Sequence, residues 1–217
     1  MAVLNYDTVA ESSEIEIVIQ KSRFIGRCFP IETEQAALDH LERIRKQHWD
    51  ASHNCYAYAI GENAQIARCS DDGEPGGTAG MPMMHVLQKR HLRNVLVVVT
   101  RYFGGTLLGA GGLVRAYSKT ASEACKAACP IQMRWSTTMQ LEMDYALWGK
   151  MQRFLHEYGV IQEAVDFAQQ VTANVLMPAE QVAHFTQAVI EATDGRIQPR
   201  PLGECYYAWP VTENEET

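Results

Sequence analysis

Two glycine-dense segments contain the residues whose types and spacing fit a chemical role. The first, RYFGGTLLGAGGLVRAY at residues 101–117, has five glycines within nine positions, Gly104, Gly105, Gly109, Gly111 and Gly112. Glycine loses more conformational freedom on folding than any other residue, so this density indicates that side chains are excluded from the space above the backbone. Arg101 precedes the glycines, and Arg115 and Lys119 follow them one helical turn apart. These amides and cations predict a phosphate-binding or nucleic-acid-binding surface.

The first segment does not match the common nucleotide-binding loops. It lacks the Lys-Ser/Thr pair of GxxxxGK[ST], and the order of Gly109, Gly111 and Gly112 does not fit GxGxxG. The alternative interpretation is tight packing, in which the glycines allow a helix or a loop to lie directly on a sheet. Ligand contact and packing are therefore both kept as explanations.

The second segment is SDDGEPGGTAGMPM, residues 70–83. Its carboxylates, Asp71, Asp72 and Glu74, are candidates for binding a hard cation such as Mg²⁺ or for acid/base chemistry. The alternative is a solvated loop in which Asp-Asp-Gly forms a turn and Thr78 caps the next helix. No other cofactor is implied, and two glycine-dense loops in one small domain suggest one shared surface.

Two further pairs are weaker candidates. His53 and Cys55 lie on the same side of a predicted strand and could form an imidazole–thiolate pair, but no third group is evident to orient them. Cys125 and Cys129 are four residues apart on a predicted helix and could supply two metal ligands. No second pair has the spacing of a zinc site, so core packing is the better interpretation.

Hydrophobic periodicity predicts the elements that position these residues. In the first part of the chain we expect two strands within residues 13–31, a helix within 32–49, a strand pair within 54–70, a helix from after Thr78 to about residue 90, a buried strand at 94–103 and a helix from about 112 to 128. Pro130 is expected to end the last helix.

The second part of the chain has a different pattern of hydrophobic residues. Its pattern predicts a strand at 135–145, a helix at 146–159, strands at 160–167 and 169–178, a helix over 182–192 and a last strand within 195–209. This βαββαβ order is typical of a ferredoxin-like domain. We therefore expect an α+β protein with domains at residues 1–133 and 136–210 and an acidic tail at 211–217.

Charge and composition narrow the functional classes. The chain has 217 residues and a net charge of −7, which argues against a protein that coats nucleic acid over its whole surface. Residues 1–135 hold 15 Lys/Arg and 14 Asp/Glu, whereas residues 136–217 hold 4 and 12, so the two parts are expected to have different partners. The acidic second domain would suit a basic protein partner.

The location of the protein is predicted from what the sequence lacks. No apolar stretch approaches the length of a membrane-spanning helix, and the N-terminal residues lack the features of a secretory signal. We therefore expect a cytoplasmic protein without a membrane partner, whose six scattered cysteines are reduced thiols.

The two glycine-dense segments, together with HNCYAY upstream, resemble the signature of the IMPACT/YigZ family, and the match spans residues 15–128. The resemblance implies a first domain with a ribosomal-protein-S5-domain-2-like fold and a second domain similar to domain V of elongation factor G. Small-molecule kinases that share the first fold place phosphate on a glycine-rich loop before a helix. Eukaryotic relatives are linked to translational control through a stress-response kinase, but that kinase-regulating activity is not transferred here, and the family supplies no established catalytic residues.

Three functional hypotheses follow. The leading one is a non-enzymatic, translation-associated module that binds RNA or a ribosomal component through the glycine-rich surface, with Tyr102 and Phe103 available to stack on bases if they are exposed. The second is a Mg²⁺-dependent enzyme or a binding protein for a phosphorylated small molecule at the same loops. The third is a protein-interaction module that uses the acidic second domain.

Overall fold

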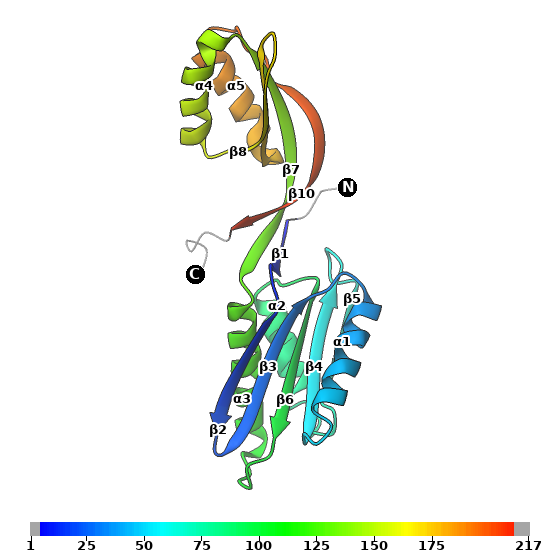
Figure 1. Ribbon diagram of the computed structural model, residues 1–217. Coiled ribbons are helices and arrows are strands. Elements are labelled where there is room, and N and C mark those ends of the chain that lie inside the picture. Colours follow the sequence, from blue (N-terminus) through cyan, green and yellow to red (C-terminus); the bar gives the residue numbers. More distant parts are fainter. Residues whose placement is uncertain (1–4, 211–217) are drawn as a thin grey trace. The chain divides into compact units, whose positions relative to one another are not determined.

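The alternation of isoleucine and glutamate near the start of the chain produces strand β2, Ser13–Ile19, which forms one edge of an antiparallel sheet. A computed structural model describes residues 5–210 of the chain (Figure 1). The sheet has five strands in the order β2-β3-β6-β4-β5. The other four strands are β3 Ser22–Pro30, β6 Val95–Tyr102, β4 His53–Ile60 and β5 Ile66–Ser70.

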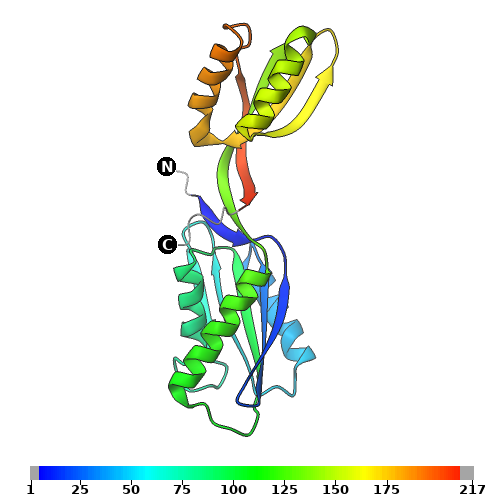
Figure 2. The same ribbon diagram turned by 90° about the vertical axis from the view of Figure 1, so that its left-hand side faces the viewer.

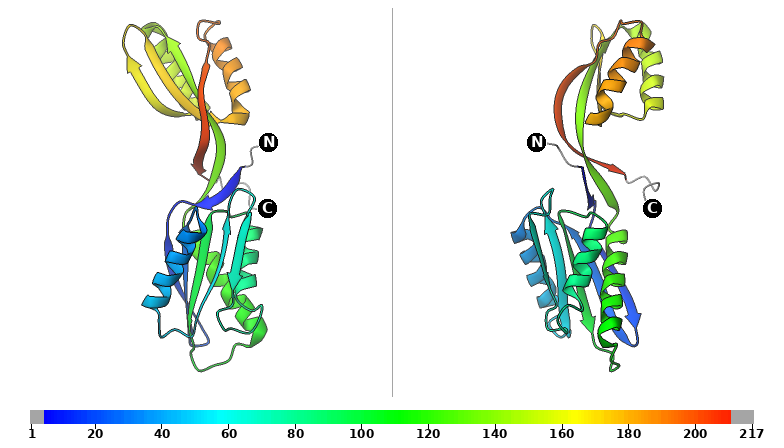
Figure 3. Two further views of the ribbon diagram at one scale, coloured as in Figure 1. Left: turned by 90° about the vertical axis from the view of Figure 1, so that its right-hand side faces the viewer. Right: turned by 180° about the vertical axis from the view of Figure 1, so that it is seen from behind.

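Three helices cover the two faces of this sheet. Helix α1, Glu34–Gln47, packs on one face, and helices α2, Gly80–Lys89, and α3, Gly109–Ala127, pack on the other (Figures 2 and 3). The central strand β6 alternates between two cores: Val97 and Val99 belong to the cluster beneath α2 and α3, and Val98 to the cluster beneath α1. Burial on both faces explains its uninterrupted apolar run, which is typical of a central strand.

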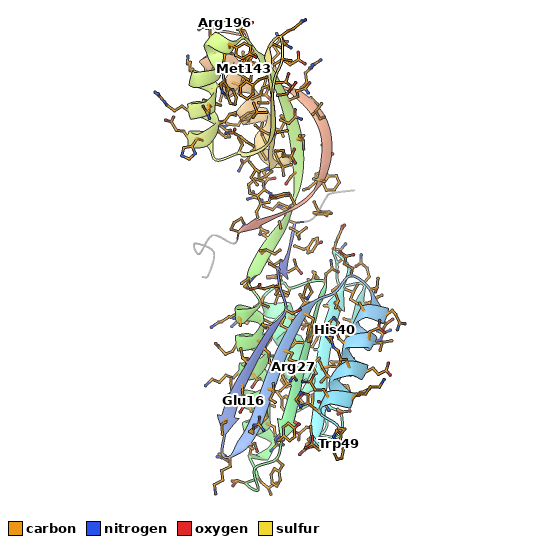
Figure 4. The ribbon with its side chains drawn as sticks, viewed as in Figure 1. Glu16, Arg27, His40, Trp49, Met143 and Arg196 are labelled. Carbon is orange, nitrogen blue, oxygen red and sulfur yellow. The ribbon has the colours of Figure 1, made fainter. Side chains whose placement is uncertain are left out.

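The antiparallel order brings four connecting segments to one end of the sheet, the lower end in Figure 1. They are the turn between β2 and β3, the segment 48–52 after α1, the loop 71–79 between β5 and α2, and the segment 103–108 between β6 and α3. Trp49, 82% exposed, lies at this same end (Figure 4). The two glycine-dense segments are therefore neighbours in space although they are far apart in the sequence.

Strand β7, Pro130–Met143, is longer than the sequence pattern predicted. Its first four residues pair with β1, Tyr6–Val9, a short strand that the sequence did not reveal because four residues show no clear alternation. Contacts divide the described chain into a first unit, residues 5–133 with 209–210, and a second unit, residues 134–208.

The second unit has the predicted βαββαβ element order. After β7 come α4 Tyr145–Tyr158, β8 Ile161–Phe167, β9 Val171–Pro178, a single 3-10 turn at Ala179–Gln181, α5 Val182–Ala192 and β10 Arg200–Pro210. β9 pairs with both β7 and β8, and β10 also pairs with β7. Leu141, Met151, Leu155 and Phe185 lie in the hydrophobic core of this unit, which is separate from the two clusters of the first unit.

Two expectations need correction. Helix α3 begins at Gly109, three residues earlier than predicted, so Gly109 opens the helix and Gly111 lies within it rather than in a loop. It ends at Ala127, and Cys129 has a positive φ of 53°, so Cys125 and Cys129 do not form a pair on one helix. The predicted acidic tail, residues 211–217, lies outside the described residues. No helix between residues 5 and 210 is long and apolar enough to cross a membrane.

Candidate functional site

A cavity of about 490 Å³ lies where the two glycine-dense segments meet, and we call it the loop cavity. The β6–α3 connection and the first turns of α3 supply most of its wall, and the segment 48–52, β4, β6 and the 71–79 loop supply its polar residues. Its lining residues are Ser52, His53, Glu74, Pro75, Arg101, Phe103, Leu107, Leu108, Gly109, Ala110 and Leu113. The walls are thus mainly apolar, and charged groups gather at one place, which is the usual composition of a ligand pocket.

The charged groups form a buried cluster around Glu74. The Glu74 carboxylate accepts hydrogen bonds at Oε1 from Arg101 Nη1 and from the Tyr117 hydroxyl, both at 2.7 Å. The side chains of Glu74 and Arg101 are only 3% and 6% exposed. The Arg101 guanidinium also lies over the rings of Phe24 and Phe103, at 5.4 and 5.5 Å from their centroids. A buried charge pair of this kind needs both partners, because either one alone would be an uncompensated charge.

Arg101 was predicted to contact phosphate as a free cation, and the structure places it differently. Its guanidinium is paired with Glu74, and the residue lines the loop cavity. Its Nε has no hydrogen-bond partner among the described residues although it is buried. An unpartnered buried donor is unusual in a folded protein and calls for an explanation.

The three candidate carboxylates do not come together as a cation site. Asp71 accepts backbone hydrogen bonds from Gly77 and Gly80, both at 2.8 Å, and from Ala79 at 3.0 Å, so it closes the 71–79 loop and caps the start of α2. Partial burial would raise the pKa of Asp71, but these three donors outweigh it and lower the pKa. No group of three or more His, Cys, Asp or Glu side chains within residues 5–210 is placed to hold a metal ion.

Asp72 fixes the neighbouring strand. It has a positive φ of 44°, and its Oδ2 accepts a hydrogen bond of 2.7 Å from the backbone N–H of Asn54. Its carbonyl oxygen lies 2.9 Å from Nδ1 of His53. Asp72 therefore orients His53 toward the loop cavity.

The His53–Cys55 pair is not formed. The Cys55 thiol donates to the carbonyl oxygen of Asp71 at 2.9 Å, while His53 bonds to Asp72. Burial raises the pKa of Cys55 to about 12, so the thiol stays protonated and is a poor nucleophile. Burial likewise raises the pKa of Tyr117, with Cys55 and Glu74 adding to the effect, and keeps its hydroxyl as a hydrogen-bond donor.

The glycines serve several purposes. A Cβ on Gly104 would lie 2.1 Å from the carbonyl carbon of Lys21, so this glycine allows the β2–β3 turn to cross the segment. Gly109 has a φ of +70° at the first position of α3. In contrast, Gly105 and Gly111 are exposed and a Cβ there would meet open space or the end of Arg115. Packing explains Gly104 and also Gly112, where a Cβ would lie 2.9 Å from Cβ of Leu108. Gly105 and Gly109 both have a positive φ, and Gly111 leaves the first turn of α3 accessible.

The predicted cations separate along α3. The guanidinium of Arg115 lies close to Gly111, near the exposed first turn of the helix. Lys119 instead lines a shallow hollow beside β2, with Ile15, Glu16 and Glu123 among its neighbours. The structure therefore brings Arg115 and the glycines together near the loop cavity and leaves Lys119 farther along the helix.

The two aromatic residues after β6 differ in exposure. Phe103 is 50% exposed and lines the loop cavity. The Tyr102 hydroxyl is within hydrogen-bond distance of Nδ1 of His48, 2.9 Å, and Oδ1 of Asp50, 3.2 Å, on the α1 side of the sheet. Only Phe103 is placed for stacking at the loop cavity.

Sequence reasoning missed the roles of His53 and Tyr117 in this site. Alternation along the predicted strand placed His53 on the face of Cys55, but its position opposite Arg101 follows from the register of β4 with β6. Tyr117 lies on the buried side of α3, and the hydrogen bond from its hydroxyl to Glu74 gives it a polar role as well. Both contacts join segments distant in the sequence, so neither leaves a local signal.

Comparison with known proteins finds relatives that match both units of the chain. The Impact N-terminal domain matches residues 20–125, and a domain of unknown function, DUF1949, matches residues 141–196. The chain is 43% identical over 213 residues to the IMPACT family member YvyE of Bacillus subtilis, covering 98% of each chain. It is 34% identical to the IMPACT family member YigZ of Escherichia coli, covering 83% of this chain and 89% of that one.

A eukaryotic relative matches only part of the chain, whereas a solved structure matches most of it. Protein IMPACT of Danio rerio is 50% identical over 62 residues, which are 27% of this chain and 19% of that one. A solved structure described as a crystal structure of a hypothetical protein matches with a TM-score of 0.58 and 31% identity, covering 92% of this chain and 98% of that one. The full-length relatives thus share both units.

Proposed function

Because the chain belongs to the IMPACT family, we propose that it is a non-enzymatic, translation-associated protein whose first unit binds single-stranded RNA, alone or in a ribosomal component, at the loop cavity. The resemblance to eukaryotic translational regulators supports the translation part of this proposal. The geometry beside α3 supports the RNA part. We expect the protein to act in the cytoplasm.

The observation that carries the proposal is the open N-terminus of α3 beside a pocket with an unpartnered arginine nitrogen. No side chain caps this end of the helix, and its first turn contains no acidic residue. Gly109 and Gly111 are exposed there, with Arg115 alongside. Free backbone N–H groups, the positive end of a helix and one guanidinium together suit a phosphate group.

The apolar wall of the loop cavity provides a surface on which an RNA base can stack. Phe103 is half exposed and Leu107 is 85% exposed. Proteins that bind single-stranded nucleic acid combine backbone phosphate contacts with aromatic side chains on which bases stack. A nucleotide with its phosphate at Gly109–Gly111 would have its base directed toward Phe103.

The affinity should be modest and sensitive to salt. The net charge of −7 opposes a polyanion, and Arg101 is neutralised by Glu74, so of the three predicted cations Arg115 is the one that lies exposed at the start of α3. Each neutralised phosphate of a single strand contributes about −0.7 to the slope of log K against log salt concentration. One or two phosphate contacts therefore predict a shallow slope.

The test is a titration of a short fluorescent RNA by anisotropy, from low to physiological salt. Arg115→Ala should weaken binding and reduce the salt slope by about 0.7. Lys126→Ala is the matched control, because it removes the same charge from the last turn of the same helix. Lys119→Ala tests whether the RNA also contacts α3 farther from the cavity, because its affinity should fall only if Lys119 meets a phosphate.

The proposal would be overturned by an RNA that binds with the same salt slope to the wild type and to Arg115→Ala. Absence of binding at every salt concentration would also overturn it.

The size of the loop cavity favours one other candidate, a binding protein for a phosphorylated small molecule. Its volume of about 490 Å³ lies in the range of small-molecule sites, roughly 300–1,000 Å³. A Mg²⁺-dependent enzyme has less support, because Asp71 and Glu74 are both occupied by protein donors. Binding of a sugar phosphate without RNA binding would favour this candidate.

Membership of the family also supports a proposal for the fold of each unit. We propose that the first unit has the S5-domain-2-like fold and that the second unit is ferredoxin-like, similar to domain V of elongation factor G. The pairing of β7 with both β9 and β10 supports the second assignment.

A further inference from the structure

The floor of the loop cavity contains three polar side chains that are connected through Glu74. His53 and Arg101 are opposite each other in the register of β4 and β6. Glu74 contacts Arg101 through Oε1 at 2.7 Å, and its Oε2 lies 3.8 Å from Nε2 of His53. Glu74 therefore lies between Arg101 and His53 at the floor of the cavity.

Each of these groups retains unused hydrogen-bonding capacity, and all three residues line the cavity. The buried Nε–H of Arg101 has no acceptor. Oε1 of Glu74 accepts two hydrogen bonds, from Arg101 and Tyr117, whereas Oε2 accepts none among the described residues. Nδ1 of His53 faces a carbonyl oxygen, which can only accept, so in the neutral ring Nδ1 carries the hydrogen and Nε2 is an acceptor. The floor therefore presents one donor followed by two acceptors.

The walls favour a flat ligand. The ring of Phe103 is half exposed, and Pro75, Leu108 and Leu113 complete an apolar surface around the polar floor. Bases that are recognised in single-stranded RNA are stacked on aromatic side chains and read along their Watson–Crick edges. The combination of an aromatic wall and a row of three polar atoms matches this mode of recognition.

We infer that the loop cavity recognises a guanine base. The Watson–Crick edge of guanine presents an acceptor, O6, followed by two donors, N1–H and the N2 amino group, which complements the donor–acceptor–acceptor floor. O6 would accept from Arg101, N1–H would donate to Glu74, and the amino group would donate to His53. The inference deepens the proposed function, on which it rests for RNA as the source of the base.

The other bases satisfy the floor less well. Cytosine presents a donor followed by two acceptors. This is the same order as the floor, so a donor would face a donor and acceptors would face acceptors. Uracil presents a second acceptor where His53 needs a donor. Adenine has one donor and one acceptor along this edge and leaves one floor group unpaired. Since an unpaired buried polar group is costly, these differences should produce selectivity.

The experiment compares guanosine with inosine, which lacks only the 2-amino group. The full chain is titrated with a short uridine-rich RNA that carries one central guanosine, inosine, adenosine or uridine, and separately with guanosine and inosine 5′-monophosphates. The wild type should prefer guanosine over inosine by roughly three- to tenfold, the usual value of one hydrogen bond. His53→Ala should bind both within about twofold, because the amino group then has no partner.

The control is His85→Ala, which removes an exposed histidine on α2 and should keep the full preference. The exchange of guanosine for inosine in the wild type leaves the protein unaltered, so the test does not depend on the folding of a variant.

Four outcomes separate the inference from the proposed function. A preference for guanosine that disappears in His53→Ala supports both. RNA binding without any preference for guanosine overturns the inference alone. Binding of guanosine monophosphate over inosine monophosphate without RNA binding supports the guanine pocket and overturns the RNA proposal. Absence of binding to every probe overturns both.

Discussion

At the scale of single residues, Glu74 determines the chemistry of the loop cavity. It is the third residue of the polar segment DGEPGG, yet its side chain is nearly as buried as the hydrophobic core. One of its oxygens accepts hydrogen bonds from Arg101 and Tyr117, and the other lies 3.8 Å from Nε2 of His53. The same carboxylate therefore stabilises the first unit and contributes to the candidate site.

Replacement of Glu74 should be strongly destabilising. Glu74→Gln leaves the buried guanidinium of Arg101 without a counter-charge and should cost about 3–5 kcal/mol of the free energy of unfolding of the first unit. Tyr117→Phe removes one hydrogen bond to the charged carboxylate and should cost about 1.5–3 kcal/mol. Urea unfolding of the full chain measures both.

Glu123→Gln is the control for Glu74, since it removes an exposed carboxylate that pairs with Lys126. It should change stability by no more than about 0.5 kcal/mol. Equal effects of Glu74→Gln and Glu123→Gln would contradict the importance of the buried ion pair.

At the scale of elements, the glycine-dense segment divides into two parts with different constraints. Gly104 lies beneath the backbone of the β2–β3 turn, which leaves no space for a side chain. Gly111 lies within the first turn of α3, where a side chain would have space. Glycine density in the sequence therefore combines a packing requirement with an accessible helix start.

Alanine substitutions should separate these two parts. Gly104→Ala places a Cβ within 2.4 Å of three backbone atoms of Lys21 and Ser22, so the turn must move and the protein should lose stability. Gly111→Ala has no such clash and should be neutral or stabilising by up to about 1 kcal/mol, because alanine is the better helix former. Thermal unfolding of the two variants provides the comparison.

The two glycine variants also bear on ligand access. If the backbone at Gly111 must approach a phosphate closely, Gly111→Ala should weaken RNA binding while it preserves stability. A loss of stability in Gly111→Ala, or tolerance of Gly104→Ala, would contradict the assignment of the two glycines.

At the scale of the whole molecule, each unit has its own hydrophobic core. Clusters centred on Phe24 and Leu41 stabilise the first unit, and a cluster centred on Leu155 and Phe185 stabilises the second. Separate cores permit separate unfolding transitions, as in other multidomain proteins.

Scanning calorimetry of the full chain should show two transitions. Glu74→Gln should lower the midpoint of one, and Leu155→Ala should lower the midpoint of the other, because a buried leucine truncated to alanine costs about 2–5 kcal/mol. A single transition that both variants shift equally would show that the two units unfold together.

The sequence determined the element types and their order, because hydrophobic periodicity is a local property. The continuous apolar run in β6 identified a central strand, and the βαββαβ order of the second unit was readable in full. The resemblance carried by the two glycine-dense segments identified the family. The short strand β1 was not predicted, because four residues carry too little periodicity and its pairing with β7 joins opposite ends of the first unit.

Only the tertiary structure decided which side chains meet. Arg101, Arg115 and Lys119 looked equivalent as cations near the glycines, but strand register buries Arg101 against Glu74, and the helical repeat carries Lys119 away along α3. The same register brings His53 opposite Arg101 at the floor of the cavity. The residues were named by the sequence, whereas their contacts depend on the pairing of β4 with β6 and on the fold of the 71–79 loop, which are long-range properties.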